Sequence, residues 1–455
     1  MRLVDVHSHT NFSIDSKNTM VASCISAMNK GLRGISFTEH VDSNPKEWGH
    51  GLYDSNAYFK ELDRVRRLYG DQIELLAGIE FSESHIYGKE LEAMSNLPYD
   101  VVLGSVHWID AGYIGDKDIL AILSQEEVEE RYFDAIRNVI AFGKIDVLAH
   151  FDITKRSFGT RLIEPDKVTQ MLIELVESSI ALEINTSSLR KGLKETMPEI
   201  ALVEEFVRLG GKRITLGSDA HYSDDLGADF VEVLTALSDD ARRCVGYFSK
   251  RRFISLWEME KQDLVNQLDN YQRRLKEYSK SDLKEIDMSE QATIELFRTF
   301  VQGDYSKLTP EQSRGHITGS AWIVNASKTK VLMTHHKKLD IWVQLGGHVD
   351  LNESVLQGAT REAFEESGLK SIQLKDEMIF DLDAHRIPKN KEREEHTHFD
   401  VRFCFVADDA EELVITPESK DLKWVSFEDI EDYTNEESIR RMVRKTIGLE
   451  KNNRF

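Results

Sequence analysis

Short apolar runs alternate with longer amphipathic stretches over residues 1–255 of the chain. Each run is bounded by glycine or polar residues, a pattern typical of buried parallel strands. The stretches between the runs, such as Glu126–Phe142 and Pro198–Leu209, have the spacing of amphipathic helices. Seven such units predict an α/β fold, a distorted TIM-like (β/α)7 barrel. The predicted strands are Arg2–Val6, Gly34–Phe37, Ile73–Ile79, Val101–Gly104, Ile145–Leu148, Ile180–Ile184 and Arg213–Leu216.

A different pattern begins near Leu256. Residues 256–288 are charged and rich in helix formers, so we expect a helical linker there, with a connecting helix over Leu256–Ser279. Residues 289–455 predict a second domain, of the α+β class, with one helix over Ser354–Ser367. Its predicted strands are Ile317–Val324, Lys330–Thr334 and His398–Val406.

Charge and cysteine content narrow the classes of function. A net charge of −22 disfavours broad binding to a nucleic-acid backbone. Small phosphorylated substrates stay compatible with it, because bound divalent metals invert the local charge. Cys24, Cys244 and Cys404 are far apart, which disfavours a disulfide framework and fits a reducing cytoplasm. The first residues run directly into a predicted strand, and no apolar run approaches membrane-spanning length, so neither a leader nor a membrane segment is expected.

Histidines and carboxylates follow six of the seven predicted strands, at the point where each strand ends. In barrels of this type the carboxyl ends of the strands form one rim, where active sites lie. A single histidine, such as His50 or His85, is more simply an ordinary surface or core residue. That explanation does not account for histidines and carboxylates at six strand ends, because such a coincidence is very improbable. The residues in question are His7, His9, His40, Glu80, His107, His150, Asp219 and His221.

Imidazole combined with carboxylate is the ligand set of zinc, iron or manganese. One such ion lowers the pKa of bound water toward neutrality, and two or three also hold the attacking and leaving oxygens of a displacement. The rim therefore predicts a metal-dependent hydrolytic site.

The first 252 residues resemble the polymerase-and-histidinol-phosphatase (PHP) superfamily. The resemblance rests on His7-Ser8-His9, Glu80, His107 and the ending Gly217-Ser218-Asp219-Ala220-His221. It implies a trinuclear metal site in which Glu80, Asp219 and His221 act in catalysis. The implied ligands are His7, His9, Glu80 and Asp219 for one metal, Glu80, His107 and His150 for the second, and Asp15, His40 and His221 for the third. Some members of the superfamily have histidine where this chain has Asp15.

The chain length and the sequence around Glu80-Phe81 and His107-Trp108 look most like those of the histidinol phosphatases of that superfamily. The resemblance implies hydrolysis of a small phosphate monoester, with histidinol phosphate as the first candidate. Arg161 and Arg190 follow the fifth and sixth strands and are candidates for a bidentate grip on a substrate phosphate. Two ordinary surface arginines are an equally good interpretation. The alternative substrates at this site are nucleotides or oligonucleotides.

A second motif runs from Gly347 to Leu369: Gly, five residues, Glu, seven residues, then Arg-Glu-Ala-Phe-Glu-Glu-Ser-Gly-Leu. Glu362, Glu365 and Glu366 are spaced i, i+3 and i+4, so a helix places them on one face. Three such carboxylates repel one another unless a cation binds, and oxygen ligands suit Mg²⁺ or Mn²⁺.

Four further residues have structural roles in this motif. Gly347 lets the loop turn into the helix without a Cβ clash. Arg361 pairs with Glu353 to hold loop and helix together, and Gly368 ends the helix.

This motif matches the Nudix box at every fixed position, and the resemblance spans residues 315–448. It implies hydrolysis of a nucleoside diphosphate linked to another moiety, with Glu365 as a catalytic residue. The alternative is a ligand-sensing regulatory domain, which has no need of an intact set of three glutamates. His396, His398 and Asp400 alternate on a predicted strand and so share a face. They either line a pocket or serve a structural role, and we favour the structural role.

Together the two motifs predict a bifunctional hydrolase that acts on small phosphorylated substrates. Zn²⁺, Fe²⁺ or Mn²⁺ is expected in the first domain and Mg²⁺ or Mn²⁺ in the second. The sequence does not decide the oligomeric state.

Overall fold

The computed structural model describes residues 3–159, 163–278, 284–303, 315–337, 340–350, 353–389, 395–417 and 419–451. The chain divides into two compact units between Met259 and Glu260, and each unit is described by itself. None of the described helices combines the length and the apolar character needed to cross a bilayer.

Seven parallel strands form the sheet of the first unit, in the order β1-β2-β3-β4-β7-β8-β9. A parallel bridge between Ser8 and Ala220 joins the first strand to the segment after the last one, so the sheet is a nearly closed barrel. The (β/α)7 prediction is confirmed. The strands are β1 (Val4–Ser8), β2 (Gly34–Val41), β3 (Glu74–Ser82), β4 (Val101–Ser105), β7 (Val147–Leu148), β8 (Ala181–Asn185) and β9 (Ile214–Gly217).

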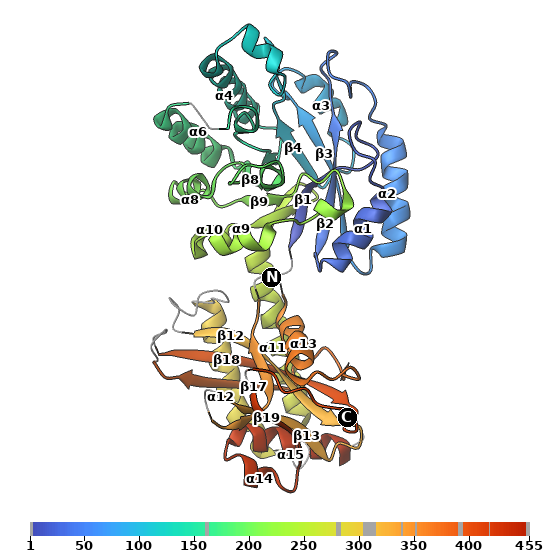
Figure 1. Ribbon diagram of the computed structural model, residues 1–455, viewed down its shortest axis with the longest axis vertical. Coiled ribbons are helices and arrows are strands. Elements are labelled where there is room, and N and C mark those ends of the chain that lie inside the picture. Colours follow the sequence, from blue (N-terminus) through green and yellow to red (C-terminus); the bar gives the residue numbers. More distant parts are fainter. Residues whose placement is uncertain are drawn as a thin grey trace. The chain divides into compact units, whose positions relative to one another are not determined.

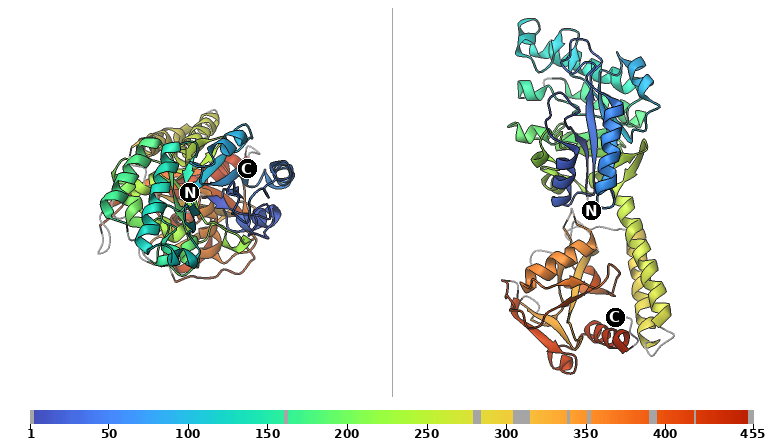
Figure 2. Two further views of the ribbon diagram at one scale, coloured as in Figure 1. Left: turned by 90° about the horizontal axis from the view of Figure 1, so that it is seen from above. Right: turned by 90° about the vertical axis from the view of Figure 1, so that its right-hand side faces the viewer.

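Helices cover the outside of this barrel. The blue helices α1 and α2 lie on one flank of the strands and the green helices α4, α6 and α8 on another (Figures 1 and 2). They and the shorter helices are α1 (Met20–Asn29), α2 (Ser55–Tyr69), α3 (Gly88–Met94), α4 (Gln125–Phe142), α5 (Lys155–Phe158), α6 (Pro165–Ser178), α7 (Ser187–Arg190), α8 (Ile200–Arg208), α9 (Phe230–Ala236) and α10 (Asp239–Arg243). Two hairpins, β5 (Trp108–Ile109) with β6 (Gly112–Tyr113) and β10 (Gly246–Ser249) with β11 (Arg252–Ser255), complete the unit.

Local sequence explains the limits of α4. The hydroxyl of Ser124 accepts from the amide of Glu127, and the Glu127 carboxylate accepts from the amide of Ser124 in return. This capping box satisfies donors that the first turn leaves without helical partners. Gly143 ends the helix at φ 74°, a left-handed conformation that glycine adopts at low cost.

The second unit contains a mixed sheet with helices packed against it, which confirms the α+β prediction. Its long strands β12 and β18 run parallel, and α13 contacts β12 and β15. The elements are β12 (Gly315–Asn325), β13 (Lys330–His336), β14 (Trp342–Val343), β15 (Leu345–His348), α13 (Val355–Ser367), β16 (Gln373–Leu374), β17 (Asp381–Ile387), β18 (His396–Ala407), β19 (Ser419–Ser426), α14 (Ile430–Tyr433) and α15 (Glu437–Lys451).

Two helices precede that sheet: α11 (Leu256–Tyr278) and α12 (Lys284–Gln302). They lie side by side as an antiparallel pair (yellow in Figure 2), joined by a Gln272–Gln291 hydrogen bond of 2.9 Å. The segment predicted to be a linker, residues 256–288, therefore contains all of α11 and the start of α12. The predicted start of the second domain, residue 289, falls inside α12. This helix packs against β17 and belongs to the second unit.

Candidate active sites

The ligand-type residues of the first unit come together at the carboxyl ends of its strands, although they lie up to 214 positions apart in the sequence. A cavity of about 570 Å³ opens there. His7 and His9, at the end of β1, are fully buried. The other predicted ligands line the cavity: Asp15, His40, Glu80, His107, His150, Asp219 and His221.

Glu80, near the end of β3, contacts imidazoles from several strands. Its Oε1 lies 2.8 Å from His150 Nε2 and 3.3 Å from His107 Nε2. Its Oε2 lies 3.0 Å from His40 Nδ1 and 3.3 Å from His7 Nε2. One carboxylate thus spans the space between separate pairs of histidines, as a bridging ligand must.

His7, His9 and Asp219 form a second group on the β1 and β9 sides of the barrel. Asp219 Oδ1 is 3.5 Å from His9 Nε2 and 3.9 Å from His7 Nε2. Asp219 has φ 53° and His150 has φ 28°, backbone conformations that cost about 1–3 kcal/mol each outside glycine. The fold holds both ligands in this geometry, since the amide of Asp219 donates to the carbonyl of His7 at 2.8 Å.

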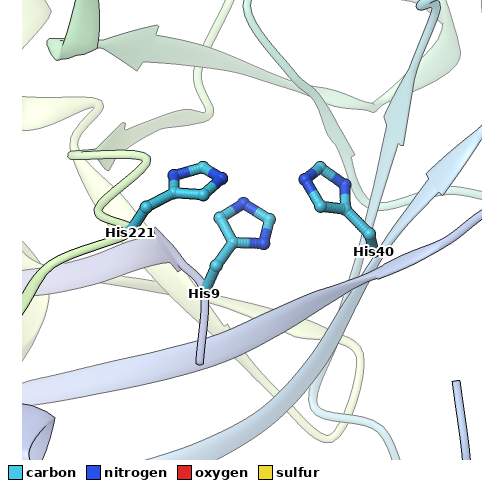
Figure 3. A group of neighbouring side chains, drawn as sticks. All are labelled: His9, His40 and His221. Atoms are coloured by element: carbon cyan, nitrogen blue, oxygen red, sulfur yellow. The ribbon is translucent and has the colours of Figure 1, made fainter. Parts of the chain in front are cut away.

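Asp15, His40 and His221 meet at the more open side of the cavity. His221 Nε2 is 3.0 Å and His40 Nε2 is 3.6 Å from Asp15 Oδ2. Figure 3 shows the rings of His9, His40 and His221 facing a common space, and the His9 ring stacks on the other two at 4.2 and 4.4 Å between centroids. All nine predicted ligands therefore lie in one cluster.

The charges in this cluster are strongly coupled. Burial by itself lowers the pKa of His7, but the carboxylates of Glu183, Glu80 and Asp219 raise it well above its ordinary value. Burial raises the pKa of Glu80, but the surrounding histidines hold it well below its ordinary value. Burial and the neighbouring rings of His40 and His221 lower the pKa of His9 to about 3, so this ring is neutral at physiological pH.

Two buried carboxylates that sequence reasoning missed support the ligands. Glu183 in β8 accepts from His7 Nδ1 at 2.7 Å and from the amide of His150 at 2.7 Å. Asp42, just after β2, accepts from the hydroxyl of Ser82 at 3.1 Å and groups with His40 and His107. The signal for Glu183 was a single charged residue inside an otherwise apolar strand.

Of the two predicted phosphate-binding arginines, Arg190 is not among the residues that line the cavity. Arg161 lies outside the described residues. Arg190 is held by the carbonyl of Ser218, by the Thr186 hydroxyl at 3.3 Å and by Asp229 at 3.4 Å. The cations that do line the cavity are Lys46, Arg156 and Lys191.

The glutamates of the second motif lie on α13 beside a smaller cavity of about 310 Å³. Glu362, Glu365 and Glu366 all line it, together with Asp350, Arg361 and the end of β15. Glu366 is buried and accepts from the amide of Gly346 at 3.0 Å, while the side chain of Glu365 is 62% exposed. The arrangement leaves carboxylate oxygens open to solvent on one helix face.

Arg361 connects the loop to this helix. It donates to Glu353 Oε1 at 2.9 Å and to the carbonyl of His348 at 2.9 Å. A Cβ at Gly347 would lie 2.4 Å from Glu362 Oε1, so a side chain there would displace the carboxylate of Glu362. Gly368 ends α13 at φ 68°.

The triplet on β18 separates into two environments. Asp400 accepts from Ser320 at 2.7 Å and pairs with Arg402 at 2.7 Å, contacts that favour the structural role. His398 instead lies among other histidines, and its ring centroid is 5.2 Å from that of His396. Burial, and then the neighbouring imidazoles, lower the pKa of His398 to about 2.

Comparison with known proteins agrees with the division of the chain into two units. Residues 5–187 match the PHP domain and residues 316–446 match the NUDIX domain. The chain is similar to a probable histidinol-phosphatase of Clostridium acetobutylicum, with 30% identity over 256 residues that cover 54% of this chain and 97% of that protein. It is also similar to the histidinol-phosphatase of Lactococcus lactis, with 29% identity over 49% of this chain and 85% of that protein.

A crystal structure of the Lactococcus lactis histidinol phosphate phosphatase, complexed with zinc, L-histidinol and phosphate, superposes with a TM-score of 0.48. The identity is 24%, over 56% of this chain and 99% of that one. The sequence similarity to the Clostridium protein spans almost the whole of that relative. The PHP match over residues 5–187 lies within the unit that carries the histidine-rich cavity. The chain is a hydrolase that belongs to the PHP family of histidinol-phosphatase-like proteins and carries a NUDIX domain after its PHP domain.

Proposed function

We propose that the PHP domain hydrolyses a small phosphate monoester, with histidinol phosphate as the first candidate substrate. The single observation that carries this proposal is the cavity that combines seven ligand-type side chains with three cations. The cations Lys46, Arg156 and Lys191 in the cavity lining can oppose the negative charge of a phosphate group. The names of the Clostridium and Lactococcus relatives point to the same substrate.

The donor set of the cavity fits several transition-metal ions. Imidazole nitrogens and carboxylate oxygens are the ligands that zinc, iron and manganese share. We assign His7, His9, Glu80 and Asp219 to one ion, Glu80, His107 and His150 to another, and Asp15, His40 and His221 to a third. Bound ions of this kind polarise phosphoryl oxygens and activate water. Glu183 fixes the His7 ring, because its carboxylate accepts from the nitrogen that faces away from the other ligands.

We propose that the NUDIX domain hydrolyses a nucleoside diphosphate linked to another moiety, with Glu365 as a catalytic residue. The donor set of its cavity consists of oxygen atoms, which suit Mg²⁺ or Mn²⁺. Glu362, Glu365 and Glu366 would hold the ion. Arg361, joined to Glu353, keeps the loop against the helix that presents these carboxylates.

A substrate screen of the purified full-length protein tests the first proposal. Histidinol phosphate, nucleoside monophosphates, sugar phosphates and short oligonucleotides are compared by phosphate release or strand cleavage. We expect the highest kcat/KM with histidinol phosphate, because the chain's net charge of −22 opposes a nucleic-acid track. Faster cleavage of an oligonucleotide would contradict this assignment.

A further inference from the structure

Five histidines on the strands of the second unit lie close together. They are His316, His348, His385, His396 and His398. We propose that three of them, His316, His348 and His398, bind a transition-metal ion of the zinc type, in addition to the sites assigned above.

Strand register places the three side chains on one face of the sheet. His316 in β12 is directly opposite His398 in β18. His348, at the end of β15, is opposite Thr318, which is two residues beyond His316 in β12. Because side chains alternate along a strand, residues 316 and 318 point to the same face, and so do their partners on the neighbouring strands.

The distances between the rings fit a shared ion. One nitrogen from each of the three rings lies within 4.8 Å of the other two. Ring centroids are 4.6 Å apart for His316 and His398, and 4.9 Å apart for His316 and His348. Nitrogen ligands of a tetrahedral zinc ion lie about 3.4 Å apart, given Zn–N bonds of about 2.0–2.1 Å. Binding of the ion would therefore draw the three ring nitrogens closer together.

Chemistry and burial favour a metal over simple packing. His316 is fully buried, His398 is partly buried and His348 is exposed, so the group connects the interior of the sheet to solvent. Protonated imidazoles at this spacing would repel one another, whereas neutral imidazoles are ligands for zinc, copper, nickel and iron. Mg²⁺, which prefers oxygen ligands, does not suit three nitrogens.

The position of His348 brings the group next to the NUDIX site. This residue follows Gly347 of the motif and also lines the glutamate-lined cavity. Three protein ligands leave a fourth position open on a tetrahedral zinc ion, as in catalytic zinc sites. The proposed site differs from the carboxylate site in its donor atoms, so the two select different ions.

Metal stoichiometry of the full-length protein tests this proposal. Chelator-treated protein is dialysed against Zn²⁺ in the presence of excess Mg²⁺, and bound zinc is measured by elemental analysis. We expect His348→Gln and His398→Gln each to bind one equivalent of zinc per chain less than the wild type. The matched control is His335→Gln: His335 lies in the same unit, pairs with Asp340 at 2.9 Å and should leave the stoichiometry unchanged.

His348 is exposed, so its replacement tests the site even where His398→Gln fails to fold. Equal zinc content in the wild type and in folded His348→Gln would overturn the proposal. A loss of one equivalent in His335→Gln as well would also overturn it, because the loss would then not report on the cluster. The proposed PHP ligands are unchanged in all of these proteins. The phosphatase assay therefore tests the proposed function of the PHP domain independently of the zinc measurement.

Discussion

At the scale of single residues, Glu183 shows how the fold supports the proposed metal ligands. It is fully enclosed in β8 and holds both the His7 ring and the backbone amide of His150. A carboxylate that accepts from a ligating histidine fixes the tautomer and the orientation of that ring. Glu183 is therefore a positioning residue rather than a ligand.

We expect Glu183→Gln to lower the affinity of the PHP site for metal by about 10- to 100-fold, as other changes to such supporting groups do. The amide keeps the size of the side chain but removes the charge that faces His7. Metal titration of phosphatase activity measures the effect, and excess metal should restore much of the rate. Glu177→Gln, on the exposed side of α6, is the control. Unchanged metal dependence in Glu183→Gln would show that this carboxylate does not position the ligands.

A second expectation concerns the cations of the cavity. Lys191 lines it, whereas the nearby Lys194 does not. We expect Lys191→Met to lower kcat/KM for a phosphate monoester by about 10- to 100-fold, which corresponds to a charge-assisted hydrogen bond worth about 1.5–3 kcal/mol. Lys194→Met should have little effect. Equal kinetics for both variants would remove Lys191 from the substrate site.

The cluster of histidines and carboxylates could be predicted from the sequence, and the cations that line the cavity could not. Histidines and carboxylates directly after apolar strands are placed by the barrel itself, since all carboxyl strand ends share one rim. Arg190 also follows a strand, but its guanidinium turns to Asp229 and the carbonyl of Ser218. The direction of a side chain in a loop depends on such contacts, which no local pattern reveals. The roles of the converged residues as ligands stay predictions.

At the scale of elements, α11 and α12 are part of the second unit although the NUDIX match begins only at residue 316. Lys445 of α15 is fully buried and donates to Asp381 at 2.6 Å and to the Tyr271 hydroxyl at 2.5 Å. It also contacts Glu290 of α12. One lysine thus joins α15 to β17 and to both preceding helices.

We expect Lys445→Met to destabilise the second unit by about 3–5 kcal/mol, because it removes the fully buried cation that pairs with both Glu290 and Asp381. Arg441 remains as the cation shared by these two carboxylates. Denaturant unfolding of the full-length protein measures the change. Lys451→Met, at an exposed position of the same helix, should stay within about 0.5 kcal/mol of the wild type. A similar free energy of unfolding for both variants would mean that this ionic network does not hold α11 and α12 in place.

The strands of the barrel could be predicted closely, and the helical hairpin only in part. The predicted strands Val101–Gly104 and Ile180–Ile184 agree with β4 (Val101–Ser105) and β8 (Ala181–Asn185) to within one residue at each end. The start of α12 is not visible in the sequence, because its first residues continue the charged, helix-forming composition of α11. What assigns the helix to the second unit is its packing on β17, a tertiary contact.

At the scale of the whole molecule, the chain joins two hydrolytic units with different ligand chemistry. The PHP cavity combines imidazoles with carboxylates, and the NUDIX cavity presents carboxylates. Among the described residues, no side chain lines both cavities. Each site should therefore be removable without the other.

The most direct test measures two activities in each of two full-length variants, Glu365→Gln and His107→Ala. The assays are phosphate release from histidinol phosphate and hydrolysis of a panel of nucleoside diphosphates linked to a sugar or a second nucleoside. Glu365→Gln should lower diphosphate hydrolysis by orders of magnitude, as expected when a catalytic metal is lost or misplaced, and leave monoester hydrolysis near wild type. His107→Ala should have the reciprocal effect. Loss of both activities in either variant, in a protein that remains folded, would contradict the account of two independent sites.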